Sequence, residues 1–194
     1  MEAGQWDSSE KVARLVRQSL EEGATVEIDG LGLFRPLPGG GFEFVAQSKP
    51  QVFLAYVEED YARVHRLYQQ LRAAGCEPWL DKKKLLPGQN WPRAIEQAIE
   101  ISNFVLPCFS LRSACKRGHF QAELRYALDC AARLPLDDVY IIPIRLEECP
   151  VPPRIRRELQ YVDLFPDWDR GLRQILDTMA RQRSKARNRL RLAG

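Results

Sequence analysis

The feature that most constrains the fold is a buried apolar run followed by a helix with one apolar face. The run 104–109 (FVLPCF) has the length and composition of a strand covered on both sides. A polar loop is predicted over 110–118, and a helix is predicted to begin at His119. Apolar residues then recur at helical spacing, at Leu124, Ala127, Leu128 and Ala131. Strand, loop and helix in this order are typical of a parallel α/β sheet.

The same alternation occupies residues 50–178. Buried strands are predicted at 52–56, 77–80, 104–109, 139–144 and 161–164. Apolar stripes predict helices between most of them, and a final helix is predicted to start at Asp167. Pro150 to Pro153 are predicted to bend the chain. The predicted fold class is therefore α/β, a flavodoxin-like five-stranded parallel sheet with helices on both faces.

Residues 1–48 follow a different pattern. A helix is predicted after the N-capping residues 7–10 and is closed by Gly23, and strands are predicted at 25–28, 33–35 and 42–45, with a turn at 38–41. This small α+β appendage is too short to bury a sufficient core alone. We expect it to pack on the main domain or on another subunit. The predicted domains are 1–48, 49–180 and a basic helical tail, 181–194.

Composition excludes several classes of protein. Five cysteines without a C-x-x-C motif, and only two histidines, suggest neither a disulfide framework nor a metal site. No apolar run reaches membrane-spanning length, and the N-terminus has no signal-peptide pattern, so a cytoplasmic protein is expected. The tail from Arg181 carries six basic and no acidic side chains. It is interpreted either as a contact for nucleic acid or an acidic partner, or as a solvated helix end.

Glu123 is the candidate functional carboxylate. It is placed beside the apolar stripe, in the first turn of the predicted helix, near the carboxyl ends of the strands, where open α/β folds bind ligands. The alternative is that Glu123 only complements the helix macrodipole. Spacing alone leaves both interpretations open.

Residues 50–178 resemble a bacterial TIR domain over nearly their whole length. The segments 52–60 and 79–91 are similar to the family's first box and to its second box, the BB loop. The segments 109–110 and 120–124 are similar to the strand and helix that carry its catalytic glutamate, and 142–144 with 151–152 complete the pattern. Some TIR domains cleave NAD⁺ between nicotinamide and ribose, whereas others are scaffolds that signal by self-association.

The resemblance implies the roles of individual residues. Glu123 stands at the catalytic position, where its charge stabilises an oxocarbenium-like ribose. The implied substrate-binding residues are Tyr56, Asp81, Lys84, Gly88 and His119. Tyr56 is also compatible with a core position, and the three BB-loop residues are also compatible with a solvated loop. His119 departs from the family pattern, because enzymatic relatives often carry Trp or Tyr there to stack on nicotinamide.

The sequence therefore predicts an NAD⁺ glycohydrolase in antiphage defence that uses NAD⁺ as substrate and needs no cofactor or metal. Nicotinamide and ADP-ribose, or a cyclic variant, are the implied products. Expected partners are other TIR domains, in a homo-oligomer or filament, and a separate sensor protein, with no membrane contact. A non-enzymatic TIR scaffold or adaptor remains the alternative.

Residues 26–34 look like the glycine-rich strand of HU-type bacterial DNA-binding proteins. Those proteins bind DNA through long basic arms, whereas this chain has a short turn at 38–41. Residues 1–48 also carry eight acidic against four basic side chains. Phosphate contacts dominate nucleic-acid affinity, so DNA binding by this segment is not expected.

Overall fold

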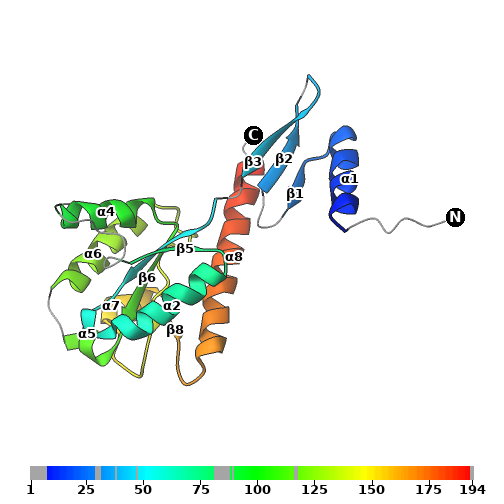
Figure 1. Cartoon of the computed structure of the whole chain (residues 1–194). Helices are drawn as coiled ribbons and strands as arrows, with labels where there is room; N and C mark the ends of the chain where they lie inside the picture. The colour runs from blue at the N-terminus through cyan, green and yellow to red at the C-terminus, as the bar shows by residue number, and fades with distance from the viewer. Residues whose placement is uncertain are drawn as a thin grey trace. The chain divides into compact units, whose positions relative to one another are not determined.

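The computed structural model describes residues 8–28, 32–37, 39–46, 48–80, 88, 90–115 and 118–192. The chain divides into two compact units, Met1–Lys49 and Pro50–Gly194. Each unit has its own sheet, and each is described by itself (Figure 1).

The larger unit is built on a five-stranded sheet. Its strands are β4 (Gln51–Ala55), β5 (Glu77–Trp79), β6 (Phe104–Phe109), β7 (Ile144–Arg145) and β8 (Val162–Asp163). They are hydrogen-bonded in the order β5-β4-β6-β7-β8, and every pair is parallel. This is the predicted flavodoxin-like sheet. The chain reverses its direction of winding between β4 and β6, which makes the carboxyl ends of these two strands the switch point of the fold.

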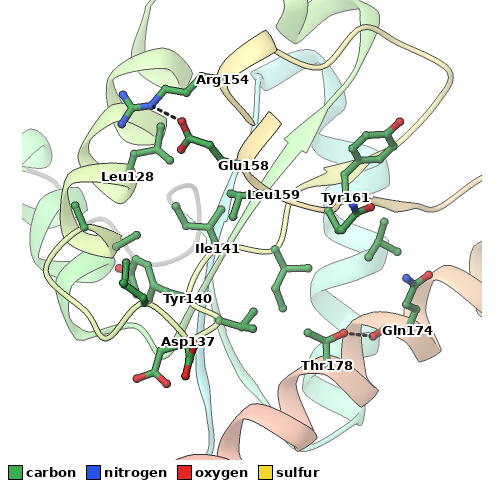
Figure 2. A pocket seen from close by; sticks show the side chains of 18 residues that line it. Leu128, Asp137, Tyr140, Ile141, Arg154, Glu158, Leu159, Tyr161, Gln174 and Thr178 are labelled. Atoms are coloured by element: carbon green, nitrogen blue, oxygen red, sulfur yellow. Dashed lines mark hydrogen bonds and ion pairs between the residues drawn. The ribbon is translucent and has the colours of Figure 1, made fainter. Parts of the chain in front are cut away.

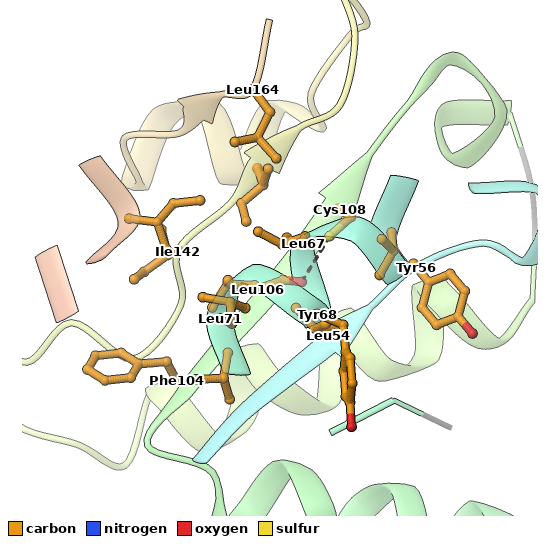
Figure 3. Close-up of a cluster of buried hydrophobic side chains, with 14 of the residues drawn as sticks. Leu54, Tyr56, Leu67, Tyr68, Leu71, Phe104, Leu106, Cys108, Ile142 and Leu164 are labelled. Atoms are coloured by element: carbon orange, nitrogen blue, oxygen red, sulfur yellow. Dashed lines mark hydrogen bonds between the residues drawn. The ribbon is translucent and has the colours of Figure 1, made fainter. Parts of the chain in front are cut away.

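Helices cover both faces of this sheet because successive strand residues point to opposite sides. Val52 and Leu54 pack toward α2 (Tyr61–Ala73) and α8 (Trp168–Leu192), whereas Phe53 and Ala55 pack toward α4 (Trp91–Ile101) and α6 (His119–Ala131). Figure 3 shows the α2 side, where the buried Leu67 and Leu71 lie against side chains of the central strands. None of the helices in the described ranges is both long and apolar enough to cross a bilayer.

The strand predicted at 139–144 is much shorter in the structure. Only Ile144 and Arg145 form a ladder, and Ile141 makes an isolated bridge to Val105. Pro143 lies between them and has no N–H to donate, although its carbonyl accepts a hydrogen bond from the Val162 N–H at 2.9 Å. Pro143 therefore interrupts the strand, but the residues on both sides of it stay paired with β6.

Two short helices replace segments that were predicted as a loop and a bend. α5 (Leu111–Cys115) lies in the predicted 110–118 loop, and α7 (Pro153–Glu158) follows the proline-rich bend. Both are too short to show an apolar stripe, which is why the pattern missed them. The chain reaches α2 through a 3₁₀ turn, η1 (Glu58–Asp60).

The smaller unit has one helix and one antiparallel sheet. Its elements are α1 (Ser8–Glu21), β1 (Val26–Ile28), β2 (Gly32–Pro36) and β3 (Phe42–Ala46), with strand order β1-β2-β3. The elements agree with those predicted for residues 7–45. Phe34 pairs with Phe44 across the β2–β3 ladder, and their ring centroids are 4.6 Å apart.

Candidate functional site

Glu123 lies in the second turn of α6. The helix begins at His119, so Glu123 is its fifth residue, and the first turn contains no acidic side chain. The placement of Glu123 in the first turn was therefore wrong by one residue. Since macrodipole effects fade beyond the first turn, the alternative that Glu123 only complements the dipole loses support. The side chain is half-buried, between the buried Leu124 and the exposed Ala122.

An aromatic pair lies one turn before Glu123. The exposed ring of His119 meets Trp91 edge-on, with ring centroids 4.4 Å apart. His119 and Glu123 are four residues apart and share one face of α6. Trp91 is the first residue of α4, whose start is fixed by Asn90, because the Asn90 side chain accepts a hydrogen bond from the Arg93 N–H at 3.2 Å. The prediction of the site did not include Trp91, although its place in the first helical turn after the BB loop was a usable signal.

A partly buried polar network joins the segments that follow three strands, β4, β6 and β7. Asp60 is fully buried after β4, and its carboxylate accepts from Arg63 at 2.6 Å and from the Ser110 hydroxyl at 2.5 Å. Arg63 also donates to Glu147, after β7, at 2.8 Å. The other Glu147 oxygen accepts the Leu111 N–H, at the start of α5, at 3.0 Å. Asp60 and Ser110 are 50 residues apart, so no local sequence signal could have revealed their contact.

These contacts make the network a support for the site. The hydrogen bond from Arg63 and the backbone N–H of Leu111 lower the pKa of Glu147. Within the described part of the chain, every buried side-chain nitrogen or oxygen has a partner. The carboxylate of Asp60 therefore holds Ser110, the residue that precedes α5. Cys108 lies in the same region, but burial strongly raises the pKa of its thiol, so it is no nucleophile at neutral pH.

The other predicted residues do not all gather around Glu123. Tyr56 is buried in the cluster with α2 and α8, on the face of the sheet opposite α6 (Figure 3). The structure thus gives Tyr56 a core position, and a role at the substrate stays a prediction. Asp81 and Lys84 lie outside the described residues. Gly88 has φ +83°, a backbone conformation that favours glycine.

Two cavities in the described part of the larger unit lie elsewhere. One of about 470 Å³ opens between the end of α6, the segment before β7, α7 and α8 (Figure 2). A second, of about 420 Å³, borders it near Tyr140 and Gln182. Both are at the amino ends of the strands, and neither is lined by Glu123 or His119. Ligands of open parallel sheets bind at the carboxyl ends, so we place the candidate site at Glu123 and the Trp91–His119 pair.

The fold and these residues agree with a family match. Residues 52–176 match the model of the TIR domain, which covers most of the larger unit and more than half of the chain. The chain therefore belongs to the TIR domain family. The predicted resemblance to a TIR domain is confirmed over residues 52–176, which contain the strands of the five-stranded parallel sheet from the second residue of β4 onward.

Individual relatives support the same assignment. The TIR domain of the Toll-related receptor TRR-2 from Hydra magnipapillata is 25% identical, with a TM-score of 0.53, over 65% of this chain and 97% of that one. The TIR domains of the activated Roq1 resistosome, which recognises the pathogen effector XopQ, share the fold at 19% identity and a TM-score of 0.51, over 66% and 98% of the two chains. The uncharacterized protein y4cD of Sinorhizobium fredii is 28% identical over 119 residues, which are 60% of this chain and 18% of that protein.

Proposed function

We propose that this TIR domain is an NAD⁺ glycohydrolase that cleaves the bond between nicotinamide and ribose. The observation that carries the proposal is the position of Glu123. It is half-buried in the second turn of α6, on the same helix face as His119, and lies at the position that the family resemblance assigns to the catalytic glutamate. A surface carboxylate that served only the helix dipole would be expected in the first turn.

The chemistry needs one carboxylate. The C–N bond between ribose C1′ and nicotinamide breaks, and its electron pair goes to the ring nitrogen and neutralises the positive charge there. The leaving group therefore needs no general acid. Positive charge develops on the ribose, where the Glu123 carboxylate stabilises it. Water then adds to C1′ and loses a proton to solvent, which gives ADP-ribose. For the cyclic variant, a nucleophilic group of the adenosine adds to C1′ in place of water and likewise releases its proton to solvent.

The aromatic pair supplies a surface for the nicotinamide ring. His119 stands where enzymatic relatives often carry Trp or Tyr, and an imidazole offers a smaller surface for stacking. Trp91 meets the imidazole edge-on at 4.4 Å and is 41% exposed, so its indole is accessible next to His119. In this proposal the two rings together bind the nicotinamide that one larger ring binds in relatives.

The biological setting belongs to the same proposal. The family resemblance favours antiphage defence in the cytoplasm, with activation by assembly of TIR domains and with a trigger from a separate sensor protein. Basic residues of the BB loop, Lys84 among them, are proposed to contact NAD⁺ phosphates or a neighbouring TIR domain.

The decisive test is nicotinamide release from NAD⁺ by the purified chain, with Glu123→Gln as the variant. Glutamine keeps the shape and removes the charge, so activity is expected to fall about 100-fold or more. Asp129→Asn is the matched control because Asp129 is an exposed carboxylate near the other end of the same helix. It is expected to keep wild-type activity, and both variants are expected to keep the wild-type melting temperature.

Two outcomes would count against this assignment. Full activity in Glu123→Gln would remove Glu123 from the chemistry. No nicotinamide release from the wild type, at any protein concentration or with a crowding agent, would favour the non-enzymatic scaffold. His119 stands where enzymatic relatives often carry a larger aromatic residue. This departure is the observation that favours the scaffold function.

A further inference from the structure

The C-terminal half of α8 carries a regular pattern of positive charge. From residue 181 to 191 every second residue is basic, and no residue from 181 to the end of the chain is acidic. The basic residues are Arg181, Arg183, Lys185, Arg187, Arg189 and Arg191. The preceding part of the helix, 168–180, has equal numbers of acidic and basic side chains. The excess positive charge of α8 is therefore confined to its C-terminal half.

The contacts of α8 show which side of this helix faces the sheet. Ile175 and Met179 are buried in the core that α8 shares with α2. Gln182 continues this side and is half-buried, and its side-chain amide donates to the Asp138 carboxylate at 2.8 Å. Ser184 is exposed and lies on the opposite side of the helix axis. The line through Ile175, Met179 and Gln182 therefore faces the domain, and the line through Ser184 faces away from it.

In an α-helix, basic residues at every second position form two stripes. Successive residues are about 100° apart around the helix axis, so residues four apart lie on the same side. The outward line follows Ser184 and Asn188, and each stripe lies about 80° from it, one on either flank. One stripe consists of Arg181, Lys185 and Arg189, and the other consists of Arg183, Arg187 and Arg191.

The two stripes place like charges next to one another. Like charges four residues apart destabilise a helix. Lys185 approaches the carboxylate of Asp137 at 3.7 Å, but their side chains are 45% and 83% exposed, so this pair contributes little. An external polyanion that neutralises both stripes would therefore stabilise the end of α8.

The arrangement of the stripes indicates which polyanion fits. A helix that lies on an anionic membrane has a broad apolar face opposite its basic residues. The outward line of α8 instead begins with the small polar residues Ser184 and Asn188. The major groove of B-form DNA is about 12 Å wide, admits an α-helix and has a phosphate backbone along each wall. This groove matches a helix with basic residues on both flanks and small polar residues between them.

We propose that residues 181–192 of α8 bind in the major groove of duplex DNA, with one basic stripe at the phosphates of each wall. Contacts with phosphates carry no sequence information, so binding is expected to be independent of the base sequence. This DNA contact does not depend on NAD⁺ cleavage by the TIR domain.

The first experiment measures binding of the full chain to a fluorescein-labelled, mixed-sequence DNA duplex of 20 base pairs by fluorescence anisotropy. We expect a Kd in the micromolar range at about 50 mM salt. A plot of log association constant against log salt concentration should have a slope of about −5, because six phosphate contacts contribute about −0.9 each. Arg181→Gln with Arg189→Gln removes two contacts from one stripe, and Arg187→Gln with Arg191→Gln removes two from the other. Each double variant should make the slope shallower by about 2 and weaken binding at least about tenfold.

Arg170→Gln with Arg173→Gln is the matched control. Both arginines are exposed near the start of the same helix, before the basic half. All three double variants lower the net charge of the protein by the same amount, so an effect of net charge alone would weaken binding equally in each. The control is expected to bind DNA with the wild-type slope. Circular dichroism of each variant checks that the helix content is unchanged.

The second experiment tests the class of polyanion. An RNA duplex of the same length has a deep, narrow major groove that side chains cannot enter, so it should bind at least about tenfold more weakly than DNA at the same salt concentration. Polyglutamate and vesicles that contain phosphatidylserine supply negative charge without a groove. At equal concentrations of charge, both are expected to displace the labelled DNA at least about tenfold less effectively than unlabelled DNA.

Four results would overturn the proposal. A wild-type chain that does not bind the DNA duplex at low salt would remove the DNA contact altogether. Equal losses in the control and in the stripe variants would attribute binding to net charge. A loss in one stripe variant alone would exclude a groove with phosphates on both walls. RNA, polyglutamate or vesicles that bind as tightly as DNA would make the end of α8 a general contact for polyanions.

Discussion

At the residue scale, Glu123 is the side chain on which the proposed chemistry depends. It lies in the second turn of α6, where a carboxylate gains little from the helix dipole, and it is half-buried. The neighbouring rings of His119 and Trp91 add apolar surface on the same side of the helix pair.

Trp91 provides a test of how the substrate is held. We expect Trp91→Ala to raise the KM for NAD⁺ about tenfold, because an aromatic contact contributes about 1 kcal/mol. The kcat should change little, because the ring binds nicotinamide in the ground state and in the transition state alike. Steady-state kinetics of nicotinamide release give both constants. Trp91→Phe should keep most of the affinity, and an unchanged KM in Trp91→Ala would show that this ring does not touch the substrate.

At the scale of elements, the site depends on how loops are tied to the sheet. Arg63 connects the segment after β4 to the segment after β7, and Glu147 continues the connection to the first residue of α5. Ser110 begins α5 as an N-cap, since its hydroxyl accepts the Ser113 N–H at 3.1 Å. The network therefore holds the start of α5 at the carboxyl end of β6.

Glu147 makes this network sensitive to acid. Its folded pKa lies below the ordinary value of 4.5, so it contributes stability above that pH and loses it as the pH falls through the folded pKa. We expect Glu147→Gln to lower the free energy of unfolding by about 0.5 kcal/mol at neutral pH, since the pair is partly exposed. The difference from wild type should shrink below about pH 4. Urea unfolding at both pH values measures it.

Glu148→Gln is the control for that experiment, because Glu148 is the exposed neighbour of Glu147. It should change the unfolding free energy little at either pH. A Glu147→Gln difference that stays constant from neutral pH to pH 3 would show that the carboxylate charge makes no contribution.

Helix α8 is held against β8 by a close approach at Gly171. A Cβ at this position would lie 2.4 Å from the carbonyl oxygen of Asp163 and 2.9 Å from a methyl carbon of Leu164. We expect Gly171→Ala to destabilise the protein by about 1–3 kcal/mol, although alanine is the better helix former. Chemical denaturation measures the change. Gly39→Ala meets no atom within 4 Å and should be nearly neutral, whereas a stabilised Gly171→Ala would show that α8 can shift without cost.

The elements that the sequence predicted well are those whose pattern is long or whose burial is two-sided. β6 and α6 fall in this group, because six buried residues and a 13-residue amphipathic helix leave strong periodic signals. α5 and α7 have five and six residues, which is too few for periodicity to show. The Asp60 network and the core position of Tyr56 depend on tertiary contacts, so no local pattern could reveal them.

At the scale of the whole molecule, self-association of TIR domains is part of the proposed function. The TIR domains are proposed to assemble through the BB loop. Contacts of the head-to-tail kind are heterologous, so they form open assemblies that grow with protein concentration.

The last prediction concerns the dependence of activity on protein concentration. Because activation by assembly of TIR domains is proposed, specific activity should rise with protein concentration instead of staying constant. Gly88→Pro should abolish this rise, since proline fixes φ near −65° and Gly88 has φ +83°. Gly88→Asn is the matched control, because asparagine tolerates positive φ and should keep the rise.

Specific activity measured over about a hundredfold range of concentration, with light scattering on the same samples, separates these effects. A flat profile that is equal for wild type and Gly88→Pro would mean that each monomer holds a complete site.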